Sequence, residues 1–238
     1  MKKTAALLGS MMMLTSLNAN ADVIGVYAGA QLWDMSAEGS YADSSMQTEY
    51  DFESEKQNRL YIEVEHPVPL IPNVKIAHSE LMTAGFEFGF DAMLIDGELN
   101  GEVDVTYTDY TLYYELFDNG LFSFDFGLTA KDFGGDFVTS NGDSLNVDTY
   151  IPMLYLSAEV ALPLTGLDVF AEGNILAIGD NTLADYQAGV AYALVDNMIV
   201  DVDVQLGYRV VEVELDDVDD IYADLKFDGV FAGLEVHF

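Results

Sequence analysis

The sequence predicts an all-β fold: a transmembrane, antiparallel, up-and-down β-barrel of about ten strands, after an N-terminal signal peptide. Two observations support this prediction. At the carboxyl end, every second residue is apolar from Val230 through Leu234 and Val236 to Phe238, where the chain stops on an aromatic side chain. Such alternation is typical of a strand with one apolar and one mixed face. At the amino end, residues 19–21 read Ala-Asn-Ala, the small-x-small motif of a signal-peptide cleavage site.

Residues 1–21 are therefore expected to be the signal peptide and residues 22–238 the barrel. Two lysines precede a short apolar stretch, residues 5–17, and the cleavage motif follows directly. The alternative is a membrane anchor. The stretch is too short for that, because a spanning helix needs about 20 apolar residues.

The composition narrows the choice of partners. Half of the residues are hydrophobic and 12% are aromatic, yet 42 acidic residues face eight basic ones and the formal net charge is −34. Nucleic-acid binding needs clustered lysine and arginine, so we expect no nucleic-acid partner. The chain has no cysteine and hence no disulfide, and no cofactor is expected. Strands that alternate between apolar and polar residues reconcile the acidity with the high apolar content.

Ten strands are expected, at 23–36, 57–66, 73–82, 103–117, 120–132, 150–162, 167–178, 183–195, 198–214 and 221–238. Their connections fall into two classes. Alternate connections are compact turns, such as Asn119-Gly120, a strong hairpin signal. The others include long acidic loops at 37–56, 83–102 and 133–149 and two short connections at 179–182 and 215–220. Short turns at one end and longer loops at the other are typical of outer-membrane barrels. Eight or twelve strands remain possible, because 83–102 could contain another hairpin.

The main alternative to a barrel is a soluble β-sandwich, whose strands also alternate. In the strand 120–132, phenylalanines 122, 124 and 126 share one face, whereas Asp125 and Lys131 share the other. A sandwich would place those polar faces in bulk water. It explains neither the terminal Phe238 nor the two classes of connection, so the barrel is favoured.

The segment 65–75 contains Pro67, Pro69 and Pro72 between two strands. Together with the signal peptide, the start Val26–Trp33 and the terminal Phe238, it resembles a family of small gammaproteobacterial outer-membrane β-barrel proteins of unassigned activity. The resemblance implies a barrel exported through the periplasm to the Gram-negative cell outer membrane, and it implies no catalytic residue. In that setting the partners are membrane lipid and lipopolysaccharide. The barrel-assembly machinery would recognise the C-terminal strand through Phe238, Val236 and Leu234.

The alternation also predicts which charged residues face the lumen. Three basic residues are expected there as partners of the acidic ones: Arg59, Lys131 and Arg209. The lumen carboxylates are expected to be Glu63, Glu65, Asp125, Glu159, Asp168, Glu172, Asp185, Asp201 and Asp203. Unpaired carboxylates in a dry interior are very costly, so this excess implies water or bound cations. Small inward residues, among them Gly127, Gly189 and Gly207, would leave room. A plugged polar lumen is favoured, and a narrow cation-preferring path is the alternative.

Eight tyrosines could form aromatic girdles at the membrane interfaces or fill the lumen: 107, 110, 113, 114, 155, 186, 192 and 208. Two acidic loop segments, 141–148 and 216–220, could hold divalent cations, although neither has a recognised calcium-loop spacing and solvated loops are favoured.

His78 lies beside Ser79 and Glu80, which raises the possibility of a membrane-embedded hydrolase. Consecutive strand residues point to opposite faces, so His78 and Ser79 are not expected to meet. No metal site and no enzymatic activity are predicted. The sequence favours a non-enzymatic outer-membrane barrel with an envelope-structural or surface-interaction role. The alternatives are a narrow cation-preferring pore for small solutes and, less favoured, the hydrolase.

Overall fold

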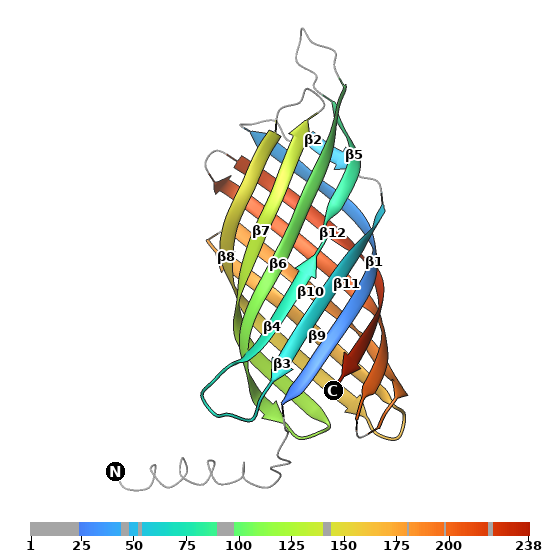
Figure 1. Ribbon diagram of the computed structural model, residues 1–238. Coiled ribbons are helices and arrows are strands. Elements are labelled where there is room, and N and C mark those ends of the chain that lie inside the picture. The colour runs from blue at the N-terminus through green and yellow to red at the C-terminus, as the bar shows by residue number, and fades with distance from the viewer. Residues whose placement is uncertain are drawn as a thin grey trace, which may run out of the picture.

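The computed structural model describes residues 24–43, 48–51, 54–89, 98–139, 144–179, 181–197, 199–218 and 221–238, which form a single β-barrel (Figure 1). The expected signal peptide, residues 1–21, lies outside these ranges. The strands are β1 (Gly25–Asp43), β2 (Thr48–Asp51), β3 (Glu55–Glu65), β4 (Asn73–Ser79), β5 (Met82–Gly89), β6 (Glu98–Asp118), β7 (Phe122–Thr139), β8 (Ser144–Leu162), β9 (Leu167–Ile178), β10 (Asn181–Val195), β11 (Asp201–Val218) and β12 (Ile221–His237).

All strand pairs are antiparallel, and β12 pairs with β1 from Tyr27↔His237 to Asp43↔Ile221, which closes the sheet on itself. The described strands occupy ten positions around the barrel, because β2 and β3 follow one another along β1, and β4 and β5 along β6. The structure thus confirms the predicted ten-stranded antiparallel barrel. The described part of the chain contains no helix that is long and apolar enough to cross a membrane.

The loops expected at 37–56, 83–102 and 133–149 are shorter in the structure, because parts of each belong to strands. Within 83–102, β5 pairs with β6 from Met82↔Asp104 to Gly89↔Glu98. The hairpin proposed there is therefore an extension of the existing one and adds no position to the barrel. Likewise β1 continues to Asp43 and β7 to Thr139. The backbone ladder continues where the apolar–polar alternation fades, because hydrogen bonding between strands does not depend on which face is apolar.

The middle of the barrel's outer face is rich in exposed apolar side chains. Leu32, Leu128 and Leu206 each expose about 60% or more of their surface (62%, 65% and 60%), although they lie in the middle of their strands. The tyrosines divide by face: 110, 114, 186, 192 and 208 are exposed on the outside, whereas 107, 113 and 155 are buried in the lumen. An apolar exterior around a polar interior is the inverse of a soluble domain and suits a lipid environment.

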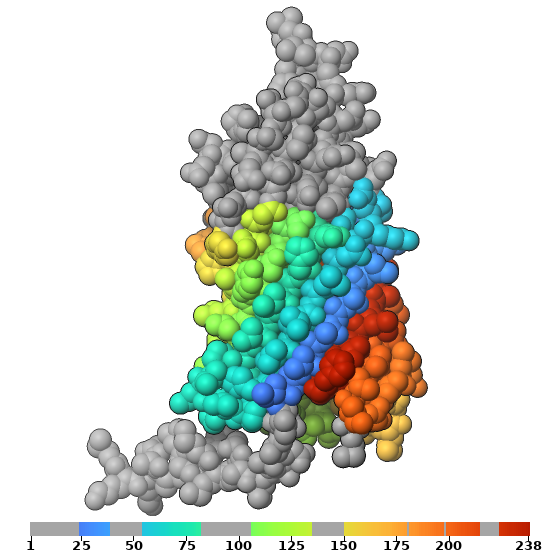
Figure 2. Space-filling model, viewed as in Figure 1, coloured from blue at the N-terminus to red at the C-terminus, as the bar shows by residue number. Residues whose placement is uncertain are grey.

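The connections divide the barrel into two ends. At the end that we call the turn end lie the four connections β3–β4, β6–β7, β8–β9 and β10–β11, together with the start of β1 and the end of β12 (Figure 1). The proline-containing turn there is held by hydrogen bonds from His66 N to Asn73 Oδ1 (3.0 Å) and from Tyr114 Oη to the Leu70 carbonyl (3.0 Å). We call the opposite end, where the long hairpins extend, the hairpin end; Figure 2 shows the strands winding obliquely between the two ends.

Aromatic side chains fill much of the lumen towards the hairpin end. The apolar cluster there consists of Trp33, Met35, Ala37, Leu81, Tyr107, Val211, Phe227 and Phe231. The expectation that small inward residues leave room is wrong at Gly207, where an added Cβ would lie 2.6 Å from the Phe231 ring. A Cβ added at Gly189 would lie 3.1 Å from the Phe170 ring. These glycines accommodate rings from neighbouring strands, so the space is occupied.

Candidate functional site

A layer of buried ion pairs crosses the lumen beside the apolar cluster. Lys131 Nζ donates to Asp109 Oδ2 (2.9 Å) and to Asp185 Oδ2 (2.8 Å). Arg209 holds both oxygens of Asp185 through Nε and Nη2, each at 3.0 Å. It also donates to the hydroxyls of Tyr107 (2.8 Å) and Ser79 (3.2 Å). Bidentate arginine–carboxylate pairing is among the strongest side-chain interactions.

A second ion-pair group lies nearer the turn end and is centred on Glu172. This carboxylate accepts hydrogen bonds from Arg59 Nη1 (3.0 Å), Lys75 Nζ (2.5 Å) and Gln187 Nε2 (2.8 Å). Lys75 also pairs with Glu63 Oε2 at 3.1 Å. Every cation here has a carboxylate partner, which offsets part of the cost of removing these charges from water.

The two ion-pair groups leave almost no free volume between them. The small cavity lined by Arg59, Asp185 and Arg209 measures about 10 Å³, room for roughly one water molecule. The exposed fraction is 0% for Lys131 and 2% for Arg209. In the described part of the chain, the lumen is therefore closed at this level, and the apolar cluster lies beyond it.

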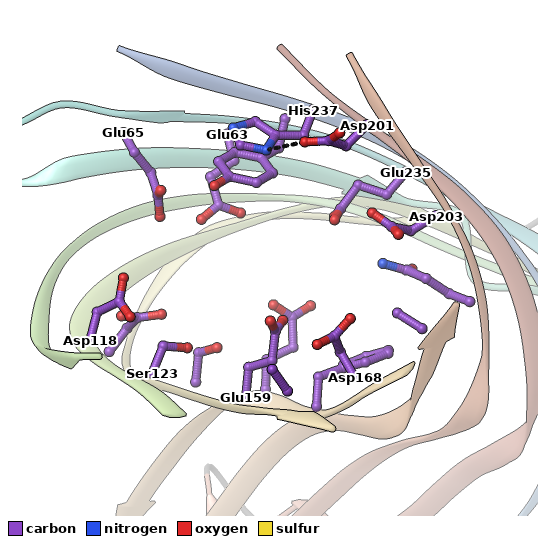
Figure 3. Close-up of a pocket in the computed structure, with 18 of the residues that line it drawn as sticks. Glu63, Glu65, Asp118, Ser123, Glu159, Asp168, Asp201, Asp203, Glu235 and His237 are labelled. Carbon is purple, nitrogen blue, oxygen red and sulfur yellow. Dashed lines mark ion pairs between the residues drawn. The ribbon is translucent and has the colours of Figure 1, made fainter. Parts of the chain in front are cut away.

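A much larger cavity of about 520 Å³ lies at the turn end. Its walls come from the strand ends that meet there, for example Tyr27 of β1, Glu159 of β8 and Asp203 of β11. Figure 3 shows carboxylates from opposite walls pointing into the space, Glu63 and Glu65 on one side and Glu159 and Asp168 on the other. The carboxylates that line this cavity are Glu63, Glu65, Glu115, Asp118, Asp125, Glu159, Asp168, Glu172, Asp196, Asp201, Asp203 and Glu235.

The carboxylates expected in the lumen divide between these sites. Asp185 belongs to the ion-pair layer. The other eight line the large cavity: Glu63, Glu65, Asp125, Glu159, Asp168, Glu172, Asp201 and Asp203. The structure also places the three expected basic residues in the lumen, in two separate groups. Arg59 pairs with Glu172, whereas Lys131 and Arg209 both pair with Asp185.

Sequence reasoning missed six charged residues that line the lumen: Lys75, Asp109, Glu115, Asp118, Asp196 and Glu235. Lys75 alternates with Asn73 and Ala77, which are also buried, so the period-2 pattern of β4 carried the signal. Glu235 likewise lies on the inward face of the C-terminal strand. Asp109 was harder to place, because it lies among tyrosines and threonines on both faces of β6.

The geometry supports neither a hydrolase built on His78 and Ser79 nor a cation site in the acidic loops. His78 is exposed on the outer face, with Nδ1 3.0 Å from Thr108 Oγ1, whereas Ser79 is buried in the lumen against Arg209. The two side chains therefore cannot act as a pair. Residues 140–143 and 219–220 of the acidic loops lie outside the described part of the chain. Within that part, no group of three or more His, Cys, Asp or Glu is arranged to hold a metal ion.

The geometry defines an integral barrel of the outer-membrane type, and solved structures share it. The outer-membrane protease OmpT from Escherichia coli aligns with a TM-score of 0.56 at 10% identity, covering 94% of this chain and 99% of that one. The translocator domain of the autotransporter NalP from Neisseria meningitidis gives a TM-score of 0.45 at 12% identity, covering 97% and 95%. Ail, the attachment invasion locus protein of Yersinia pestis, gives 0.34 at 13% identity, covering 90% and 99%.

No family model and no curated protein matches the chain. At these identities the likeness shows the fold alone, and of these three alignments the one with OmpT has a TM-score above 0.5. The solved structures that the chain resembles are outer-membrane β-barrel proteins. The particular gammaproteobacterial family stays a prediction.

Proposed function

We propose that the protein is an integral barrel of the Gram-negative outer membrane whose closed lumen serves envelope structure or surface interaction, with no enzymatic activity. The observation that carries this proposal is the ion-pair layer around Lys131, which is fully buried between Asp109 and Asp185. An ion crossing the lumen would have to displace these pairs, and breaking a buried pair costs about 3–5 kcal/mol.

The apolar exterior and the two kinds of end support the placement in the membrane. In outer-membrane barrels the short turns face the periplasm and the longer connections face outwards. The turn end would thus lie in the periplasm, and the hairpin end would meet lipopolysaccharide. There the acidic loops would be bridged to lipid phosphates by divalent cations. The C-terminal strand, with Leu234, Val236 and Phe238, would carry the signal read by the barrel-assembly machinery during export.

A narrow cation-preferring pore is the second candidate, because the acidic cavity would concentrate cations at one mouth. Ion conductance separates the two. Folded protein is inserted into planar lipid bilayers under a salt gradient, with insertion checked by the heat-resistant migration of the recovered barrel. A general porin in the same bilayers provides the positive control.

We expect no regular conductance steps from inserted barrels. Discrete cation-selective steps would overturn the closed-lumen proposal in favour of the pore. In that case the double substitution Asp201→Asn and Asp203→Asn should reduce the cation selectivity, because these carboxylates line the mouth. The hydrolase stays the least favoured reading, since His78 and Ser79 lie on opposite faces.

A further inference from the structure

We propose that the large cavity at the turn end is a binding chamber for an extended organic polycation, of the class of linear aliphatic polyamines. This inference goes beyond the proposed function: it depends on the cavity and does not require the lumen to be closed. Its starting point is the imbalance of charge. Twelve carboxylates line the space, and Lys75 is the single lysine or arginine among the described lining residues. Carboxylates confined together repel one another, and cations between them relieve that repulsion.

A second observation concerns Gln187, which faces the lumen from β10, lines the cavity and is only 5% exposed. Its Nε2 donates to Glu172 Oε1 at 2.8 Å. A carboxylate can only accept in this contact, so the orientation of the amide is fixed and Oε1 is its free end. Gln187 Oε1 accepts no hydrogen bond from any described residue. A buried carbonyl oxygen without a donor is costly. The oxygen itself is not exposed to the chamber, so a small rotation of the Gln187 side chain is needed before an ammonium group can donate to it.

Lys75 shows how this chamber holds an ammonium group. Its Nζ lies between Glu172 (2.5 Å) and Glu63 (3.1 Å). The same nitrogen lies 5.1 Å from the centre of the Tyr61 ring and 5.9 Å from that of Tyr155. Carboxylates beside aromatic faces are a favourable environment for alkylammonium ions. Elsewhere the lining of the chamber repeats this combination of groups, because the aromatic residues Tyr27, Phe122 and Phe170 lie among the other carboxylates.

The spacing of the charges favours an extended ligand over a metal ion. A calcium ion requires six to eight oxygens that converge on one point. No such group of three or more candidate ligands occurs in the described residues. Instead, Glu63 and Glu65 face Glu159 and Asp168 across the space (Figure 3). A volume of about 520 Å³ is in the range of small-molecule sites, and charges distributed over its walls match charges distributed along a chain.

Isothermal titration calorimetry on the folded protein in zwitterionic micelles tests this. Spermine and spermidine are the probes, and magnesium chloride and methylamine are compared at equal ionic strength. We expect spermine to bind saturably, at one molecule per barrel and at least about tenfold more tightly than Mg²⁺. The double variant Glu159→Gln, Asp203→Asn should weaken spermine binding by about tenfold, as expected for the loss of two ion pairs of up to about 1 kcal/mol each.

The matched control is Asp132→Asn, Asp224→Asn, which removes the same charge from the outer face of β7 and β12. It should leave spermine binding unchanged. Equal weakening in both double variants, equal affinity for Mg²⁺, or no saturable spermine binding would overturn the proposal. The lumen variant removes repulsion and should fold; heat-resistant migration checks this, and Asp168→Asn serves in its place if it does not. Conductance does not enter this test, so the two proposals can fail separately.

Discussion

Lys131 and Asp185 meet inside the lumen, with Nζ 2.8 Å from Oδ2, although they are 54 positions apart in the sequence. They come from β7 and β10, which are not neighbours in the sheet. Asp109 of β6 and Arg209 of β11 join the same layer. The contact therefore spans the barrel and ties four strands together through its centre. The stability of the barrel therefore depends on ion pairs across the lumen as well as on the backbone hydrogen bonds between neighbouring strands.

Removing the cation of this layer should be strongly destabilising. Lys131→Met leaves Asp109 and Asp185 with one fewer partner, and we expect the free energy of unfolding to fall by about 3–5 kcal/mol. Lys226→Met is the matched control, because Lys226 pairs with Asp228 at 2.9 Å on the partly exposed outer face. Its loss should cost less than about 1 kcal/mol. Urea unfolding followed by tryptophan fluorescence measures both, and similar losses would contradict the structural role of the layer.

The closing seam between β12 and β1 should not tolerate a side chain at Gly229. A Cβ there would lie 1.9 Å from the Asp34 carbonyl oxygen of the neighbouring strand. Because backbone must move to relieve this contact, Gly229→Ala should cost at least about 1–3 kcal/mol or prevent closure. At Gly134 an added Cβ meets nothing within 4 Å, so Gly134→Ala should be nearly neutral. The yield of heat-resistant barrel after refolding distinguishes the two variants, and an unaffected Gly229→Ala would refute the close approach.

The turn between β8 and β9 should be stabilised by glycine. Leu164 has φ 68° after Pro163, and Thr165 N donates to the Leu162 carbonyl (3.3 Å), as in a type II turn. A left-handed conformation costs a leucine about 1–2 kcal/mol, and the Leu164 side chain is fully exposed. Leu164→Gly should therefore raise the urea midpoint. Leu121→Gly, at a turn position with negative φ, should lower it. A fall in both would show that the Leu164 side chain contributes contacts of its own.

The terminal residue should matter more for assembly in cells than for stability. Phe238 and Val26 exchange two backbone hydrogen bonds, at 3.0 and 3.2 Å, at the end of the closing seam. Deleting Phe238 removes both, which should cost about 1–3 kcal/mol of unfolding free energy. If the aromatic end is also the assembly signal, the amount of folded barrel in outer membranes should fall further than this loss predicts. Phe238→Tyr keeps the ring and the backbone and should behave like the native chain.

Much of the fold followed from the sequence because it rests on local rules. Period-2 alternation assigned the outer and inner faces, and turn residues such as Asn119 and Gly120 marked the tight connections. The ends of the strands did not follow. Beyond the apolar band no face has to be apolar, so the alternation that marks a strand is lost where β5 and β6 still pair.

The sequence by itself determined that the chain forms a barrel with an apolar exterior, and that its lumen is rich in carboxylates, because each of these properties is written along single strands. Only the tertiary structure decided that Glu172 gathers Arg59 and Lys75, that Asp185 is paired while Glu159 and Asp203 line an open chamber, and that Phe231 fills the space above Gly207. Those relationships depend on the strand register and on the closure of the sheet. Both are set by the whole barrel, and no single strand encodes them.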